Sequence, residues 1–236
     1  MLKYIETIDQ KRLRRMNMKI GVIQAASQIE KNSLLYRCTL DAVKQYDYEV
    51  INFGCFENEA FSYSYVEIAV AISFLPSSGA VDFVVTGCSS GQGMMLACNS
   101  MPGVLCGLAV RAQDAFLFGR INDGNAISIP LGNGFGWDGE ENLKSILKEL
   151  FRGPFGSGYP AREAERKRKD TRLMKKLNGM TKKNALSVYC QLDKELVRKV
   201  LRKQKIAEYI IQHAKNRQIA EFIRKAVIET QDRKEE

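Results

Sequence analysis

Short apolar runs alternate with longer amphipathic segments over the first two thirds of the chain. The runs suit buried parallel strands, which are apolar on both faces, and they span 19–23, 49–53, 81–86, 104–110 and 126–129. Segments typical of helices separate or follow them, at 28–46, 63–75, 92–100, 112–120 and 138–151. Strands that alternate with helices at short intervals predict βαβ units joined by right-handed crossovers. We therefore expect an α/β fold, a three-layer Rossmann-like sandwich around a five-stranded parallel sheet.

The pattern changes after a stretch rich in glycine and proline at 153–160, which we take as a domain boundary. Beyond it the chain is densely charged, and helices are expected at 181–189, 193–203 and 205–228. This gives three regions: an N-terminal leader (1–17), an α/β domain (18–158) and a basic helical C-terminal domain (159–236). The apolar stripe of the C-terminal helices is expected to pack either on the core or on a second subunit.

Individual residues set the expected ends of several helices. We expect Pro76 to end the helix at 63–75, because proline lacks the N–H group that a continuing helix needs. Asp138 and Thr181 are suited to cap the helices that follow them.

The composition is that of a globular protein. With 236 residues, 45% of them hydrophobic, the chain can bury a core. Its apolar segments are all shorter than the ~20 residues needed to cross a bilayer. The N-terminal residues carry acidic groups and lack the apolar core of a signal peptide. We therefore expect a cytoplasmic protein with no membrane partner.

The net charge of +9 is unevenly distributed. Residues 1–158 contain 14 Lys and Arg against 16 Asp and Glu, whereas residues 159–236 contain 22 against 11. Nucleic-acid binding by the basic C-terminal region is one hypothesis, and such binding would weaken steeply with salt. However, acidic residues are interspersed among the basic ones, and no aromatic stacking pattern accompanies them. We therefore do not expect nucleic acid to be the partner.

The six cysteines, at 38, 55, 88, 98, 106 and 190, are irregularly spaced and form no C-x-x-C pair. Most lie inside apolar runs, so we expect reduced and buried thiols at every position except Cys88. The one histidine, His213, makes a zinc site unfavourable. We expect neither a metal nor a cofactor.

The segment from Val84 to Asn99 joins an apolar run, a turn of small residues and a helical pattern. Its turn, C-S-S-G-Q-G, places the Cys88 thiol before closely spaced glycines. Glycines let backbone N–H groups approach a ligand, and the start of a helix adds a positive dipole end, so this turn favours an anion. It matches neither a P-loop nor a dinucleotide fingerprint. Ligands of α/β sheets bind beyond the carboxyl ends of the strands, where we expect Cys88, Asn122 and the loop 132–136.

Four motifs in a fixed order carry a resemblance to one family. They are C-x-[ST]-G-x-G at 88–93, A-x-N at 97–99, P-G-V at 102–104 and N-D-x-N at 122–125. Over about residues 18–158 the chain resembles the sugar-phosphate isomerases that comprise type B ribose-5-phosphate isomerase and the galactose-6-phosphate isomerase subunits. The C-terminal region looks like the extra domain of a divergent branch of that family.

The resemblance implies an aldose–ketose isomerase that acts on a ribose-5-phosphate-like or hexose-6-phosphate-like sugar through a cis-enediol, in a homodimer with a shared active site. Cys88 matches the general base and Ser90 the hydroxyl beside it. A thiol at a helix N-terminus ionises readily, which supports this role. Backbone N–H groups of the same turn would hold the enediolate oxygen. The residues expected to bind substrate in this way are Ser89, Gly91, Gln92, Gly93, Asn122 and Asp123.

More ordinary explanations remain open for the same residues. For Cys88 the alternative is a small buried residue that closes a strand. Asn122 and Asp123 are also favoured in turns, where their side chains make local hydrogen bonds.

The chain departs from the family pattern at the residues that would transfer other protons. An Asp-His pair after the first strand is replaced by Ala25 and Ala26, and the histidine before N-D-x-N, associated with ring opening, is replaced by Ile121. These apolar groups cannot transfer a proton. An open-chain substrate would make the loss of the histidine harmless. A protein that binds sugar phosphates without catalysis is the alternative function.

The family's phosphate-binding arginine near the fifth strand is replaced by the loop 132–134. Arg162 and Arg166 are candidates for that role as a bidentate clamp, and solvated charge in a basic helix is the alternative. Arg111 and Arg120 are further candidates, and for both the alternative is a surface residue. We expect His213 to be structural or exposed.

Overall fold

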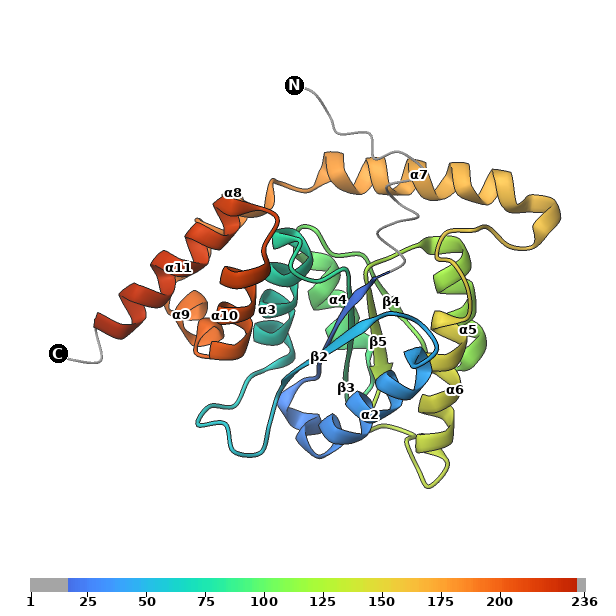
Figure 1. The fold of residues 1–236 in the computed structure, drawn as a ribbon, viewed down its shortest axis with the longest axis horizontal. Coiled ribbons are helices and arrows are strands. Elements are labelled where there is room, and N and C mark those ends of the chain that lie inside the picture. Colours follow the sequence, from blue (N-terminus) through green and yellow to red (C-terminus); the bar gives the residue numbers. More distant parts are fainter. Residues whose placement is uncertain (1–16, 233–236) are drawn as a thin grey trace.

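The computed structural model describes residues 17–232 and shows a parallel sheet between two layers of helices, with a helical appendage at one side (Figure 1). This confirms the predicted fold class. The strand order is β2-β1-β3-β5-β4 and every neighbouring pair is parallel. The strands are β1 (Lys19–Ile23), β2 (Glu49–Gly54), β3 (Phe83–Cys88), β4 (Cys106–Leu108) and β5 (Ala126–Pro130). The predicted leader falls almost entirely outside the described residues.

Side chains from alternate strand positions enter two separate apolar layers, as the period of two in a strand requires. Val22, Val85 and Ile127 face one helical layer, and Ile23 and Val84 face the other. The first layer contains α2 (Asn32–Val43), α5 (Ala112–Leu117) and α6 (Gly139–Phe151), and the second contains α3 (Tyr65–Ser78) and α4 (Gln92–Ser100).

The C-terminal appendage consists of a short turn and five helices: η3 (Ala161–Glu163), α7 (Ala164–Thr181), α8 (Ala185–Tyr189), α9 (Lys194–Leu201), α10 (Gln204–His213) and α11 (Arg217–Asp232). Helices α8 to α11 pack beside α3 in the same chain and share its apolar cluster (Figure 1). Tyr189 is fully buried there, where its hydroxyl donates to the Ser73 carbonyl at 2.9 Å. The apolar stripe of these helices therefore lies on the core of its own chain.

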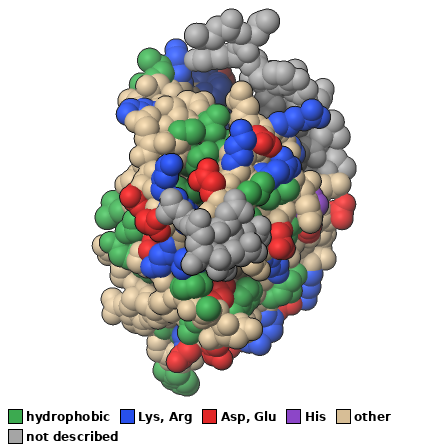
Figure 2. Space-filling model, turned by 90° about the vertical axis from the view of Figure 1, so that its left-hand side faces the viewer, with side chains coloured by type: hydrophobic (Ala, Val, Ile, Leu, Met, Phe, Trp, Pro, Cys, Tyr) green, Lys and Arg blue, Asp and Glu red, His purple; other side chains and the backbone are tan. Residues whose placement is uncertain are grey.

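Helix α7 takes a different course and runs across the amino ends of the strands (Figure 1). Its contact with the α/β layers includes the Thr171 hydroxyl, which donates to the Ile121 carbonyl at 2.6 Å. On the face of the appendage that Figure 2 shows, Lys and Arg side chains alternate with Asp and Glu. Ion pairs within α7, such as Arg166 with Asp170 at 3.1 Å, add to this mixed surface.

Two helix ends and one capping contact differ from the sequence prediction. Helix α3 continues through Pro76 to Ser78 and ends at Gly79, whose φ is 71°. Because α3 is buried between the sheet and the appendage, its packing outweighs the lost N–H group. Thr181 ends α7, and the side chain of Asn184 caps α8 instead. Asp138 occupies the N-cap position of α6, but its side chain makes no capping hydrogen bond.

Other predicted elements are shorter or divided. The predicted helix at 205–228 is two helices, because the chain between them turns to donate the Lys215 and Asn216 N–H groups to the Ser78 carbonyl, both at 2.9 Å. The predicted helix at 28–46 begins instead with the 3₁₀ segment η1 (Ala26–Lys31), and α5 leads into the π-helical segment η2 (Phe118–Asn122). Among the described helices, none combines the length and apolarity needed to cross a bilayer.

Candidate active site

The glycine-rich turn lies where β3 ends and α4 begins, and we call residues 88–93 the cradle. Gly91 precedes α4 with a φ of 75°, which a residue with a Cβ atom rarely adopts. A Cβ atom on Gly87 would lie 2.3 Å from the Ile129 carbonyl oxygen, so only glycine lets β3 and β5 approach so closely. The buried Ser128 hydroxyl donates to the Gly91 carbonyl at 2.7 Å and fixes the turn.

Cys88 is the last residue of β3, opposite Pro130 of β5, and 8% of it is exposed. Ser89 is exposed and Ser90 is half-buried beside it. The Ser90 hydroxyl accepts the Gln92 N–H at 3.3 Å, so its own proton remains available for donation. The first N–H groups of α4 belong to the cradle and have no acceptor within the helix. A thiol, a hydroxyl and helix-start N–H groups therefore lie within six consecutive residues at this end of the sheet.

A polar cavity of about 440 Å³ borders the cradle. Residues 27–31 after β1 line one side, and residues of the loop between β5 and α6 line the other. A Cβ atom on Gly132 would lie 2.8 Å from Ser89 Oγ and 2.9 Å from Gln28 Nε2, so these two side chains converge on the space that the glycine leaves. The Lys31 ammonium lies 4.8 Å from the centre of the Phe135 ring in the same cavity.

Gln28 and Lys31 were not singled out from the sequence. They reach the cavity because η1 folds residues 26–31 into a tight 3₁₀ turn, with Gln28 itself in a non-helical conformation. The apolar pattern of this segment predicted a regular helix and gave no sign of that turn.

The carboxyl end of β1 supplies backbone contacts rather than proton-transfer groups. The Ala25 N–H donates to the Gly87 carbonyl at 2.9 Å, and the Ala26 N–H donates to the Tyr63 carbonyl at 3.3 Å. Gln24 is fully buried and bonds to Cys55 and Asn32. This part of the chain therefore ties together the loops around the cradle.

Asn122 and Asp123 do not lie beside Cys88, which corrects the placement expected from the sequence. Both residues precede β5 and stand at the amino ends of the strands, whereas Cys88 stands at the carboxyl end of a parallel strand. The six residues of β3 separate the two ends by about 20 Å. Asn122 is exposed, and Asp123 has a φ of 52° and forms an ion pair with Lys175 at 2.5 Å. Within one chain, Cys88 and the Asn122–Asp123 pair therefore lie at opposite ends of the strands.

The arginine candidates also lie away from the cradle. Arg162 and Arg166 are exposed in η3 and α7, on the same side as Asn122, and Arg166 pairs with Glu163 and Asp170. Arg111 is exposed at the start of α5.

Arg120 is neither a surface residue nor near the cradle. It is 4% exposed and donates to the carbonyls of Leu150 at 2.9 Å and Arg152 at 2.8 Å, so it caps the C-terminus of α6. His213 is exposed on α10 and its ring lies 4.3 Å from that of Tyr209, as the prediction of a structural or exposed histidine required.

Two asparagines of the sequence motifs serve the fold. Asn99 bonds to the backbone N–H and carbonyl of Cys106, both at 2.8 Å, and holds α4 against β4. Asn125 accepts from the Leu105 N–H at 2.8 Å and donates to the Gly103 carbonyl at 2.7 Å. These motifs therefore fix the connections that place the cradle.

The remaining cysteines are free thiols, and all but one are buried as expected. Cys190 is exposed, which corrects that expectation for one residue, because its turn lies at the surface after α8. Burial raises the pKa of the Cys38 thiol, and the neighbouring Cys98 thiol together with burial raises that of Cys106. Within residues 17–232, His, Cys, Asp and Glu form no group of three or more suited to a metal ion.

Comparisons with known proteins identify the family. The family model described as Ribose/Galactose Isomerase matches residues 21–169. The crystal structure of a 4-deoxy-L-threo-5-hexosulose-uronate ketol-isomerase complexed with a tartrate is similar, with 36% identity, a TM-score of 0.85, and coverage of 89% of this chain and 99% of that one. A ribose-5-phosphate isomerase from Vibrio parahaemolyticus is 33% identical with a TM-score of 0.85, covering 89% of this chain and 100% of that chain.

More distant similarity concerns the fold alone. The type B ribose 5-phosphate isomerase of Trypanosoma cruzi is 22% identical with a TM-score of 0.53, covering 68% of this chain and 99% of its own. A comparison with curated proteins returned no match. The family match over residues 21–169 and the two full-length structural matches show that this chain belongs to the ribose/galactose isomerase family and is a sugar isomerase.

Proposed function

We propose that the chain is an aldose–ketose isomerase of a phosphorylated sugar in which Cys88 moves the proton between C1 and C2. The observation that carries this proposal is the position of Cys88, the first residue of the cradle, at the carboxyl end of β3, where the neighbouring Ser89 is hydrogen-bonded to Gly132 of a polar cavity. The strand order also reverses between β1 and β3. From β1 the chain goes first to β2 on one side of β1, and then crosses to β3 on the other side. Ligands of α/β sheets bind at such points.

The chemistry needs a base, an oxyanion site and a hydroxyl. The Cys88 thiolate takes the proton from C2 of the open-chain aldose. The electron pair of the broken C2–H bond then forms the C1–C2 double bond of a cis-enediolate. The oxygen that becomes negative is held by N–H groups at the start of α4. Ser90 donates its hydroxyl proton to O1 and takes up the proton of the C2 hydroxyl in exchange, so that C2 becomes the ketose carbonyl, and the Cys88 thiol returns the carbon proton to C1. Atoms and charge balance without a cofactor.

The anionic end of the substrate then lies in the cavity beside Ser89. Lys31 supplies a positive charge there, and Gln28 and Ser89 supply hydrogen-bonding groups near Gly132. An ammonium close to an anion in a partly enclosed cavity makes a charge-assisted hydrogen bond, the stronger kind. This contact takes the place of the arginine that the family has near the fifth strand.

The second half of the site is supplied by a partner copy in this proposal. Asn122, Arg162 and Arg166 lie at the edge of the sheet opposite Cys88, so they can border its substrate only from another chain. Helix α7, which carries Arg166, exposes an apolar stripe at helical spacing, formed by Leu173, Leu177 and Met180. Such a stripe suits contact with a second subunit.

An open-chain sugar acid is a second substrate class. The ketol-isomerase that is 36% identical to this chain acts on a hexosulose uronate, whose anionic group is a carboxylate. The replacement of the ring-opening histidine by Ile121 also favours a substrate that needs no ring opening. Lys31 serves a carboxylate as well as a phosphate.

Solvent-proton exchange tests the reaction directly. Aldose phosphates, ketose phosphates and open-chain uronates are incubated with the protein in deuterated water, and deuterium at C2 of the aldose is followed by NMR. Wild type is expected to exchange with one of these classes, whereas Cys88→Ala loses exchange by at least about 10³-fold, with its fold intact by circular dichroism. Binding without exchange would instead establish the non-catalytic alternative, and full exchange by Cys88→Ala would remove the proposed base.

A further inference from the structure

The loop between β2 and α3, residues 55–64, forms a wall next to the cradle. It lies at the carboxyl ends of the strands, on the side where Cys88 lies (Figure 1). Its end is tied to the start of η1 by the hydrogen bond from Ala26 N–H to the Tyr63 carbonyl. Tyr65 follows at the start of α3, and its ring would lie 3.3 Å from a Cβ atom on Gly93. Tyr65 is 44% exposed and borders the cradle, so it can contact a substrate.

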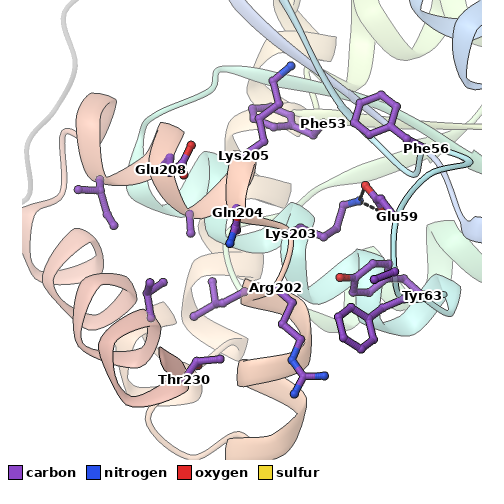
Figure 3. A pocket seen from close by; sticks show the side chains of 16 residues that line it. Phe53, Phe56, Glu59, Tyr63, Arg202, Lys203, Gln204, Lys205, Glu208 and Thr230 are labelled. Atoms are coloured by element: carbon purple, nitrogen blue, oxygen red, sulfur yellow. Dashed lines mark hydrogen bonds and ion pairs between the residues drawn. The ribbon is translucent and has the colours of Figure 1, made fainter. Parts of the chain in front are cut away.

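The appendage holds this wall through one buried ion pair. Lys203, at the junction of α9 and α10, places its ammonium 2.5 Å and 2.8 Å from the two carboxylate oxygens of Glu59 (Figure 3). The Lys203 side chain is only 1% exposed, whereas that of Glu59 is 21% exposed. The ammonium also lies 4.9 Å from the centre of the Tyr63 ring. One cation from the appendage therefore contacts both the middle and the end of the loop.

The Cys55 and Tyr63 side chains that lie beside the Lys203 ammonium are neutral. Burial raises the pKa of the Cys55 thiol to about 11 and that of the Tyr63 hydroxyl to about 12, so both groups are neutral near pH 7. Cys55 Sγ lies 4.0 Å from the Lys203 ammonium. Removing one partner from a buried pair leaves the other charge uncompensated, which makes such a contact a strong constraint on position.

A second contact from the same junction holds the tip of the loop. The Arg202 guanidinium lies 4.5 Å from the centre of the Phe61 ring, a cation–π contact. Both rings and both cations line a cavity of about 430 Å³ between the loop and the appendage (Figure 3). The junction of α9 and α10 thus contacts the loop along most of its length.

We propose that Lys203 is a positioning residue for the active site: its pair with Glu59 fixes the loop 55–64 so that Tyr65 is held against the cradle. This inference rests on the proposed function only in naming the cradle as the substrate site. It gives the appendage a role in substrate binding within its own chain. The role requires no contact between Lys203 and substrate.

Limited proteolysis tests the constraint without any need for turnover. Chymotrypsin cleaves after aromatic residues, and Phe56 and Phe61 lie in the loop. In Lys203→Met we expect cleavage at these sites to be about 10-fold faster than in wild type, since a released loop opens more often. Lys215→Met is the matched control, because this appendage lysine pairs with Asp82 at 3.8 Å, at the far end of α3. It should leave the cleavage rate unchanged.

Kinetics on the substrate found by the exchange assay test the role in binding. Lys203→Met should raise KM by about 10-fold with kcat within about 2-fold, because a mobile wall weakens binding more than proton transfer. The double variant Glu59→Lys with Lys203→Glu restores an ion pair with reversed charges and should recover most of both properties. Two results for a folded Lys203→Met variant would overturn the proposal. One is a cleavage rate equal to that of wild type, and the other is faster cleavage with an unchanged KM. If wild type itself catalyses no exchange, the proposed function fails while the cleavage result still decides whether the loop is held.

Discussion

The role proposed for Lys31 depends on its position rather than on its residue type. The chain contains 36 Lys and Arg residues, and most of those described lie at the surface. Among the described residues that line the cavity beside the cradle, Lys31 carries the one positive charge, and the Phe135 ring lies under its ammonium. A cation placed on an aromatic face is partly immobilised before substrate arrives, which lowers the entropic cost of binding an anion.

Replacing Lys31 tests this role at the scale of one residue. Lys31→Met should raise KM for an anionic substrate by about 10–100-fold and leave kcat within about 3-fold, because a hydrogen bond to a charged group contributes about 1.5–3 kcal/mol. Lys44→Met is the control, since Lys44 is exposed at the other end of α2. Initial-rate kinetics decide the matter. An unchanged KM in Lys31→Met would show that another group binds the anion.

The site residues also differ in how far sequence alone predicts them. The apolar run before Cys88 and the small residues after it predicted a strand end and a tight turn, and the structure confirms both. The prediction that Asn122 lies near Cys88 was wrong. Asn122 precedes the strand β5, so the sequence order already placed it at the amino end of that strand. Lys31 was missed because its approach to the cavity depends on a 3₁₀ turn and on a loop a hundred residues away, which no local pattern encodes.

At the scale of elements, the start of α3 carries a capping box that supports the wall of the cradle. The Ser64 side chain accepts the Glu67 N–H at 3.2 Å, and the Glu67 carboxylate accepts the Ser64 N–H at 2.8 Å. Lys199 of the appendage adds an ion pair to Glu67 at 2.6 Å. Burial alone would raise the pKa of Glu67, but the hydrogen bonds from Lys199 and Ser64 outweigh it and lower the pKa.

This lowered pKa predicts a pH-dependent contribution to stability. A carboxylate whose pKa is lower in the folded state stabilises the fold above its unfolded pKa, and the contribution disappears as pH falls through the folded value. Glu67→Gln should therefore reduce the free energy of unfolding by about 1–2 kcal/mol at pH 7, with a much smaller difference at pH 3. Urea unfolding followed by circular dichroism at both pH values measures it. A difference of equal size at both values would contradict the assignment.

At the scale of the whole molecule, the appendage has two parts with separate roles. Helices α8 to α11 complete the core over α3, so a chain cut at the predicted boundary near residue 158 would expose the buried side chains that α3 shares with them. The boundary predicted from glycine and proline marks a change in composition. The apolar cluster, however, includes side chains from both sides of that boundary. Helix α7 instead places its charges and its apolar stripe at the amino ends of the strands, where Asn122 also lies.

Subunit complementation tests whether two copies build one site. In a dimer with an isologous interface, each site would combine the Cys88 edge of one chain with the Asn122 edge of the other. Cys88→Ala and Asn122→Ala should each be nearly inactive alone. When the two variants are mixed, partly unfolded together and refolded, half of the dimers contain one copy of each. One of the two sites in such a dimer is intact, so about a quarter of wild-type activity should return. Mixing Asn122→Ala with Arg166→Ala, which alter the same edge, is the control and should restore nothing above the more active variant. Sedimentation of wild type as a monomer, or no recovery in the first mixture, would place the whole site within one chain.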